Sequence, residues 1–317
     1  METIPEEWKA MSAPGTANVL LAKIRERVGR IESMPSIPAV FVPLLKLLNA
    51  PEEQVRLDDV VKLISYDHAI AAQCLRVANS PLFGLARPPE TIKGAVLALG
   101  MRRVETILLT CCLGQAFPTK HWPLDAIVYW RHSLGCAMVC RKFAEKLSSI
   151  DGDKAYMAGL LHDIGVMVNC LSFPAEFGVA VAHAVEQQIP LAQAESSTMG
   201  FTHCETGRAL AEKWNLGEAI TQVIAHHHAI ERSESDHALV ALVHLCDLLC
   251  RMRGLGYGYY ERQKIDLAYN PAWGVLLQEH SELEGVDLVR FTFEMDDAVA
   301  NIYDMVATIF AATPVRN

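Results

Sequence analysis

The chain has 317 residues, of which 51% are hydrophobic and 21% are charged, and its formal net charge is −9. This composition is that of a globular protein and excludes intrinsic disorder, while the acidic balance excludes general affinity for nucleic acid phosphates. The N-terminus is acidic and no stretch approaches the ~18 apolar residues of a membrane span, so we expect a cytoplasmic protein without a secretory signal or membrane contact.

The first third of the chain carries the apolar spacing of short helices and no strand pattern. Asp67 is placed to cap one helix, and Gly100 to end another. The turn-forming segment 79–84, NSPLFG, must connect two helices. After a loosely held leader, 1–16, we expect helices near 17–31, 35–50, 57–64, 67–79, 91–99 and 102–112.

The remainder is predicted to be helical as well. Thr202 and Glu205 have the spacing of a capping box, which places His203 in the first turn of a helix. The stretch 157–166, MAGLLHDIGV, is predicted to lie in one helix that ends before Pro174. The other expected helices are 126–147, 176–187, 203–214, 218–227, 238–253 and a C-terminal cover at 296–310.

Ionisable residues are set into several of these apolar helices. The adjacent His162 and Asp163 are the clearest case, because a buried imidazole and carboxylate must be hydrogen-bonded, ion-paired or bound to metal. Inward-pointing histidines and carboxylates from a helical bundle are suitable ligands for Fe, Mn, Zn or Ni. The candidate metal ligands are His132, His162, Asp163, His203, His227, His228 and Asp247.

Two other patterns are given structural interpretations. The pairs Cys136/Cys140 and Cys246/Cys250 are each four residues apart and would lie on one helix face, but the nine cysteines contain no CxxC pair. We expect them to be small buried residues. The sequence GYGY at 256–259 is predicted to be a turn.

The order of these residues resembles that of the HD superfamily of metal-dependent phosphohydrolases, and more specifically of the HDOD family, the HD-related output domain of bacterial signalling proteins. The NSPLFG segment is the most discriminating feature, because catalytic HD enzymes lack such an N-terminal helical subdomain. The matching segments are 34–38 (MPSIP), 75–84 (LRVANSPLFG), 130–133 (WRHS), 158–165 (AGLLHDIG), Trp214 and His227-His228.

The resemblance implies an all-α protein in which an N-terminal helical bundle is followed by an HD-type helical bundle. The implied division is a leader with the first helix at 1–30, an HDOD N-terminal subdomain at 31–120, an HD-like subdomain at 121–255 and a C-terminal helical extension at 256–317. By the superfamily's pattern, His132, His162, Asp163 and Asp247 would hold one ion. Asp163 would bridge to a second ion held by His203 and by His227 or His228.

Three functions are compatible with this resemblance. The first is a signalling module without turnover, which binds partner proteins and keeps one or two divalent transition ions, with Fe or Mn favoured and Zn or Ni as alternatives. The second is a phosphohydrolase acting on a nucleotide or cyclic dinucleotide, in which two ions activate a water molecule. The third is a redox or oxygen sensor. Against catalysis, Val166 stands where related HD-GYP phosphodiesterases carry a lysine.

Overall fold

The structure is a computed structural model that describes residues 14–29, 40–48, 55–65, 67–80, 83–116, 122–147, 149–262, 266–267, 269–285 and the single positions 290, 293, 302, 303 and 306. Every regular element in these ranges is a helix, which confirms the all-α prediction. None of the described helices is both long and apolar enough to cross a membrane.

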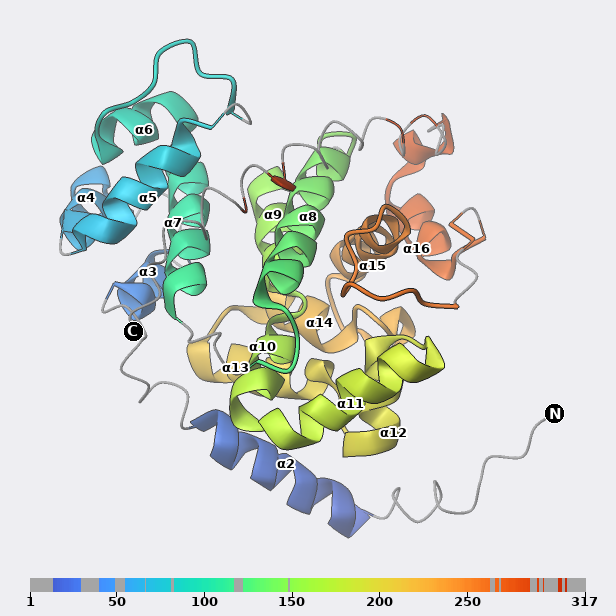
Figure 1. Ribbon diagram of the computed structural model, residues 1–317. Helices are drawn as coiled ribbons and strands as arrows, with labels where there is room; N and C mark the ends of the chain where they lie inside the picture. Colours follow the sequence, from blue (N-terminus) through green and yellow to red (C-terminus); the bar gives the residue numbers. More distant parts are fainter. Residues whose placement is uncertain are drawn as a thin grey trace.

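Helices α3 to α7 form a bundle at one end of the molecule (Figure 1). The long α7 is its centre, and α3, α5 and α6 all pack against it. Asp67 caps α5 by accepting hydrogen bonds from the amides of Ala69 and Ile70, as predicted. The helices are α3 (Phe41–Leu48), α4 (Leu57–Ser65), α5 (His68–Ala78), α6 (Ile92–Leu99) and α7 (Met101–Ala116).

The second half is a larger bundle built around α8, which packs against both α9 and α15. Below this pair α10 packs against α13, and α16 covers the outer side of α15 (Figure 1). The elements are α8 (Ala126–Ala144), α9 (Gly152–Leu161), α10 (Ile164–Ser172), α11 (Pro174–Gln187), α12 (Leu191–Met199), α13 (His203–Trp214), α14 (Glu218–His226), η4 (Ile230–Arg232), α15 (His237–Met252), α16 (Pro271–Glu279) and η5 (Ser281–Gly285).

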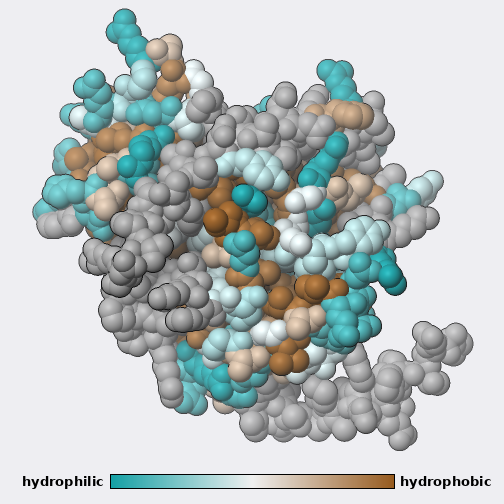
Figure 2. Space-filling view, in the orientation of Figure 1, coloured by the Kyte–Doolittle hydropathy of each residue, from teal (hydrophilic) through white to brown (hydrophobic). Residues whose placement is uncertain are grey.

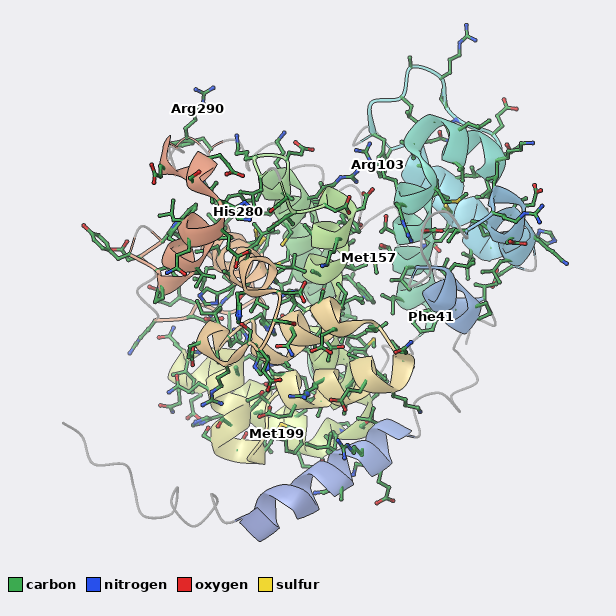
Figure 3. All side chains as sticks on the ribbon, turned by 180° about the vertical axis from the view of Figure 1, so that it is seen from behind. Phe41, Arg103, Met157, Met199, His280 and Arg290 are labelled. Atoms are coloured by element: carbon green, nitrogen blue, oxygen red, sulfur yellow. The ribbon has the colours of Figure 1, made fainter. Side chains whose placement is uncertain are left out.

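The two bundles are joined by direct packing. Helix α7 packs on α9, and Figure 3 shows Arg103 and Met157 on the two sides of this seam. The rings of Phe41 and Trp214 pack in a T-shaped arrangement with their centroids 4.8 Å apart. Although it precedes the first bundle in the sequence, α2 (Pro14–Gly29) packs against α13 and α10 of the second bundle. Among the residues coloured in Figure 2, hydrophobic and hydrophilic side chains are intermixed on this face.

The prediction of one continuous helix through His162 and Asp163 is wrong. Helix α9 ends at Leu161 and α10 begins at Ile164, with Asp163 at φ −101° and ψ 19° between them. The two segments pack against different helices, α9 against α8 and α10 against α13, and the break lets each segment follow its own partner. This break turns the Asp163 side chain into the middle of the bundle.

Two glycines permit these contacts. A Cβ added to Gly159 would lie 2.8 Å from the Cys136 carbonyl oxygen of α8. A Cβ added to Gly165 would lie 1.8 Å from the carbonyl oxygen of His203, the first residue of α13. The glycines flanking the His-Asp pair therefore bring the backbones of α8 and α13 close to it.

The other helices mostly follow the predicted pattern. The capping box of Thr202 and Glu205 is present and α13 ends at Trp214, as predicted. Helix α12 was not predicted, and it supplies a residue to the site described below. The predicted leader up to residue 13 and the segment 34–38 lie outside the described residues, as does nearly all of the expected helix 296–310.

Candidate metal centre

The structure brings all seven predicted site residues together, from five different parts of the second bundle. His132 comes from α8, the pair His162 and Asp163 from the α9–α10 junction, and Asp247 from α15. His203 opens α13, and His227 and His228 follow directly after α14. Six of the seven are at most 2% exposed, whereas the side chain of His228 is 27% exposed. The cluster is therefore buried and reaches the surface on the side of His228.

Asp163 lies at the centre of the cluster, and its two oxygens face different histidines. Its Oδ2 lies 3.1 Å from Nε2 of both His132 and His162. Its Oδ1 lies 3.2 Å from Nε2 of both His203 and His227. One carboxylate thus connects two groups of imidazoles.

These contacts divide the cluster into two groups of ligand atoms. In the first, here called the inner group, ligand atoms of His132, His162, Asp247 and Cys136 all lie within 4.8 Å of one another. In the second, the outer group, the same holds for Asp163, His203, His227 and His228. The grouping follows the two-ion division that the family resemblance implies, with Asp163 placed to bridge it. Cys136 is an addition that the sequence did not predict.

The Nδ1 atoms of four imidazoles have partners outside the centre. His132 Nδ1 donates to the Leu255 carbonyl at 2.7 Å, and His162 Nδ1 to the Gly159 carbonyl at 2.8 Å. His203 Nδ1 donates to Glu195 at 2.6 Å, and His227 Nδ1 to the Val223 carbonyl at 3.0 Å. These acceptors fix each ring with Nε2 directed at Asp163 and the other imidazoles, which is how outer partners orient metal-bound histidines.

The fit of these residues to metal ions can be tested on their hydrogen bonding. Among the described residues, Asp163 Oδ1 and His227 Nε2 are buried and have no hydrogen-bond partner, although they face each other at 3.2 Å. Buried polar atoms without partners cost about 1–3 kcal/mol each, so this arrangement is unfavourable unless something binds them. A divalent ion between such nitrogen and oxygen atoms would satisfy them, and the cluster could therefore hold a metal.

The charges in the cluster are strongly coupled. Burial alone would raise the pKa of Asp163, but the neighbouring His162, His203 and His132 outweigh it and hold that pKa well below its usual value. Burial alone would lower the pKa of His132, but the carboxylates of Asp163 and Asp247 raise it well above its usual value. In the ion-free protein a proton on His132 therefore supplies positive charge that an ion would otherwise bring.

Three further residues support the ligands. Glu195 of α12 is fully buried, accepts from both Nδ1 and the backbone amide of His203, and receives a hydrogen bond from Asn169. Arg251, one turn after Asp247 on α15, pairs with that carboxylate at 3.3 Å. The sequence does contain a signal that could have identified Glu195 as a supporting residue. It is a single acid among the apolar residues of α12, eight residues before His203.

Tyr257 is the functional residue that the sequence interpretation missed most clearly. The segment was predicted to be a turn, and it does turn after α15, with Gly254 and Gly258 at φ 77° and 83°. It also carries the buried Tyr257 hydroxyl onto Oδ2 of Asp163, while Leu255 supplies the carbonyl that orients His132. Spacing along the chain could not show this, because the turn lies far from Asp163 in sequence.

Comparisons with known proteins agree with this geometry. Residues 34–230 match the HDOD domain. The structure of an HDOD domain protein of unknown function from Geobacter sulfurreducens is 32% identical with a TM-score of 0.78, covering 93% of this chain and 99% of that one. A candidate phosphohydrolase from Shewanella amazonensis SB2B shares the fold at 21% identity and a TM-score of 0.68, covering 89% and 97%.

A curated relative extends beyond this chain. It is an uncharacterised protein of Treponema pallidum (strain Nichols), 26% identical over 228 residues, which is 70% of this chain and 43% of that protein. The chain thus spans less than half the length of the curated relatives it matches.

Proposed function

The chain belongs to the HDOD family, and on that premise we propose that it is a cytoplasmic regulatory protein of bacterial signal transduction, acting on partner proteins and stabilised by an HD-type metal centre. Asp163 carries this proposal, because its two oxygens each face a separate pair of imidazoles. The net charge of −9 supports protein partners over nucleic acid.

The donor set favours particular ions. Five imidazoles and two carboxylates suit divalent transition metals, and we favour Fe or Mn over Zn or Ni. His132, His162, Asp163 and Asp247 would hold one ion, and Asp163, His203, His227 and His228 the other. Bound there, the ions would supply Lewis acidity, which in an open site polarises a phosphoester and activates water.

The residues around the centre support a role without turnover. The Tyr257 hydroxyl closes onto Asp163 Oδ2, and its ring lies 4.9 Å from that of His132, so the inner group is covered. Val166, where a substrate-binding lysine would stand by the resemblance, is fully buried. Arg251 is held by the carboxylates of Asp247 and Glu261. With the centre covered in this way, the role left for the candidate ligands is to bind ions. The bound ions would then hold five parts of the bundle together.

A hydrolysis assay on metal-loaded protein tests the proposal. The full chain is loaded with Fe(II) or Mn(II), its bound metal is measured, and bis(p-nitrophenyl) phosphate and cyclic dinucleotides are offered as substrates. We expect bound metal without hydrolysis above the level of an Asp163→Asn variant. Protein that holds no metal after such loading would contradict the proposal. So would hydrolysis that disappears in Asp163→Asn.

The second outcome would favour the alternative, a metal-dependent phosphohydrolase acting on a nucleotide or cyclic dinucleotide. One observation supports this alternative: the seven residues predicted as ligands by the HD pattern lie in one cluster. If Tyr257 only closes a resting site, a Tyr257→Ala variant should open it. Hydrolysis by Tyr257→Ala that Asp163→Asn abolishes in the same background would establish the chemistry and make Tyr257 a cover that must move.

A further inference from the structure

The inner group contains a side chain of a different chemical kind from the others. Cys136 lies one helical turn after His132 on α8, so both side chains project from the same face of that helix. The Cys136 Sγ atom lies 3.8 Å from His132 Nε2. The residue is fully buried. A thiol in this place is either a small packing group or a ligand.

Three distances measured from His132 Nε2 match the spacing of ligand atoms around one metal ion. Metal–ligand bonds of about 2.0–2.3 Å place tetrahedral ligand atoms roughly 3.3–3.6 Å apart. His132 Nε2 lies 3.2 Å from His162 Nε2 and 3.3 Å from Asp247 Oδ1. Together with the 3.8 Å to Cys136 Sγ, the three measured edges depart from tetrahedral values by only a few tenths of an ångström.

We propose that Cys136 is a thiolate ligand of the inner ion, alongside His132, His162, Asp247 and the bridging Asp163. The outer group offers only nitrogen and oxygen atoms, so the two halves of the centre differ in softness. The inner half selects Zn(II), Co(II) or Fe(II) over Mn(II), because thiolate favours softer ions. This inference rests on the proposed metal centre and adds a ligand and a metal preference to it.

The proton on the sulfur has to leave when the ion enters. Burial raises the pKa of the Cys136 thiol, so the ion-free protein holds it as S–H. Coordination replaces that proton with the metal and releases it to solvent. The sulfur is neither oxidised nor reduced. Cys140 lies one turn further along α8, and among the described residues it belongs to neither group of ligand atoms.

Cobalt provides a probe that reports sulfur ligation directly. The metal-free full chain is titrated with Co(II) under reducing, anaerobic conditions while its near-ultraviolet absorption is recorded. Wild-type protein should develop a thiolate-to-cobalt charge-transfer band that saturates with binding. Cys136→Ser should lose that band and still bind cobalt in the outer group. Cys140→Ser is the matched control, because its side chain lies outside both groups, and it should keep the band.

The outcomes separate this inference from the proposed function. Cobalt bound by wild-type protein without the band, or a band that persists in Cys136→Ser, would overturn the thiolate and leave the metal centre standing. Failure of wild-type protein to bind any cobalt would remove both. If Cys136→Ser does not fold, X-ray absorption on the wild-type cobalt complex decides instead, since a bound thiolate gives a sulfur neighbour at about 2.3 Å.

Discussion

The two bundles of this molecule bury very different interiors. In the described part of the N-terminal bundle, the buried polar side chains are one amide, two threonines and Glu105, which pairs with Arg102. The second bundle buries a whole set of ionisable groups at its centre, together with Glu195 and Asn169 as their supports. The described core of the N-terminal bundle is mostly apolar, whereas the core of the second bundle surrounds a cluster of ionisable side chains.

This difference shows where each bundle obtains its stability. Hydrophobic packing needs no additional component, so α3 to α7 should be stable without any ion. Burying a carboxylate among imidazoles costs free energy unless charges and hydrogen bonds compensate one another, and Asp163 Oδ1 and His227 Nε2 make no hydrogen bond. The second bundle should therefore depend on its metal, and the first should not.

The largest expected effect is that of removing the metal. Chelation should lower amide hydrogen-exchange protection in α8, α9 and α15 and leave α5 and α7 little changed, because the candidate ligands found among the described residues all lie in the second bundle. An ion present at 1,000 times its dissociation constant adds about 4 kcal/mol to the free energy of unfolding. Hydrogen exchange read by mass spectrometry measures both bundles in one sample. Equal loss of protection in the two would contradict the comparison.

The Gly165→Ala substitution should disrupt the second bundle through packing alone. Its Cβ would lie 1.8 Å from the His203 carbonyl oxygen, so α10 and α13 would have to separate. We expect a loss of about 3 kcal/mol or more in the free energy of unfolding, measured by urea denaturation. Gly274→Ala is the control. A Cβ there meets nothing within 4 Å, and alanine should stabilise α16 by about 0.5–1 kcal/mol. Equal changes in the free energy of unfolding for Gly165→Ala and Gly274→Ala would argue against the close contact between α10 and α13.

A smaller effect is expected from Glu195→Gln, which keeps the shape of the side chain and removes its charge. Because Glu195 orients His203, the substitution should weaken binding to the outer group by about 10–100-fold. Competition with a fluorescent chelator would measure this affinity, and binding by the inner group should change less. Glu186→Gln, on the exposed side of α11, should leave both affinities unchanged. If Glu186→Gln weakened metal binding to the same extent, the loss of one negative charge anywhere in the protein would explain the effect, and not the contact with His203.

The smallest effect is the pH dependence of the metal-free protein. Carboxylates raise the pKa values of His132 and His203 above the ordinary 6.5, so between pH 6.5 and those values the folded chain binds more protons than the unfolded chain. The free energy of unfolding should fall with rising pH in this window, by up to ~1.4 kcal/mol per pH unit for each imidazole. Denaturation at several pH values measures the slope. Metal-loaded protein should lack this pH dependence, because the ions displace the protons from His132 and His203. An equally steep slope in metal-loaded protein would show that these protons are not displaced.

Much of this architecture could be predicted from local patterns. The apolar spacing predicted the helices, and Asp67 and the Thr202–Glu205 box predicted the first turns of α5 and α13. The convergence of the seven site residues followed from the resemblance to a family together with the cost of burying charge. The helix pattern and the family resemblance both depend on residue types and on their order along the chain, and the sequence contains this information.

The remaining features depend on contacts between distant segments. The break at Asp163 lets α9 pack against α8 and α10 against α13, and local propensity does not record such packing between distant segments. Tyr257 reaches Asp163 from 94 positions away, and Glu195 and Cys136 gain their places only when α12 and α8 are folded around the centre. A cysteine in a helix or a tyrosine beside a glycine usually has a structural role. From the sequence we therefore interpreted Cys136 as a small buried residue and Tyr257 as part of a turn.

The most direct test of the account is the number of metal ions bound per chain. Elemental analysis of protein purified without chelator should find close to two divalent transition ions in the wild type. Asp163→Asn should hold far fewer, while Asp153→Asn, whose carboxylate pairs with Arg141 outside the centre, should match the wild type. Wild-type protein that stays free of metal even after incubation with Fe(II), Mn(II) or Zn(II) would contradict the central claim.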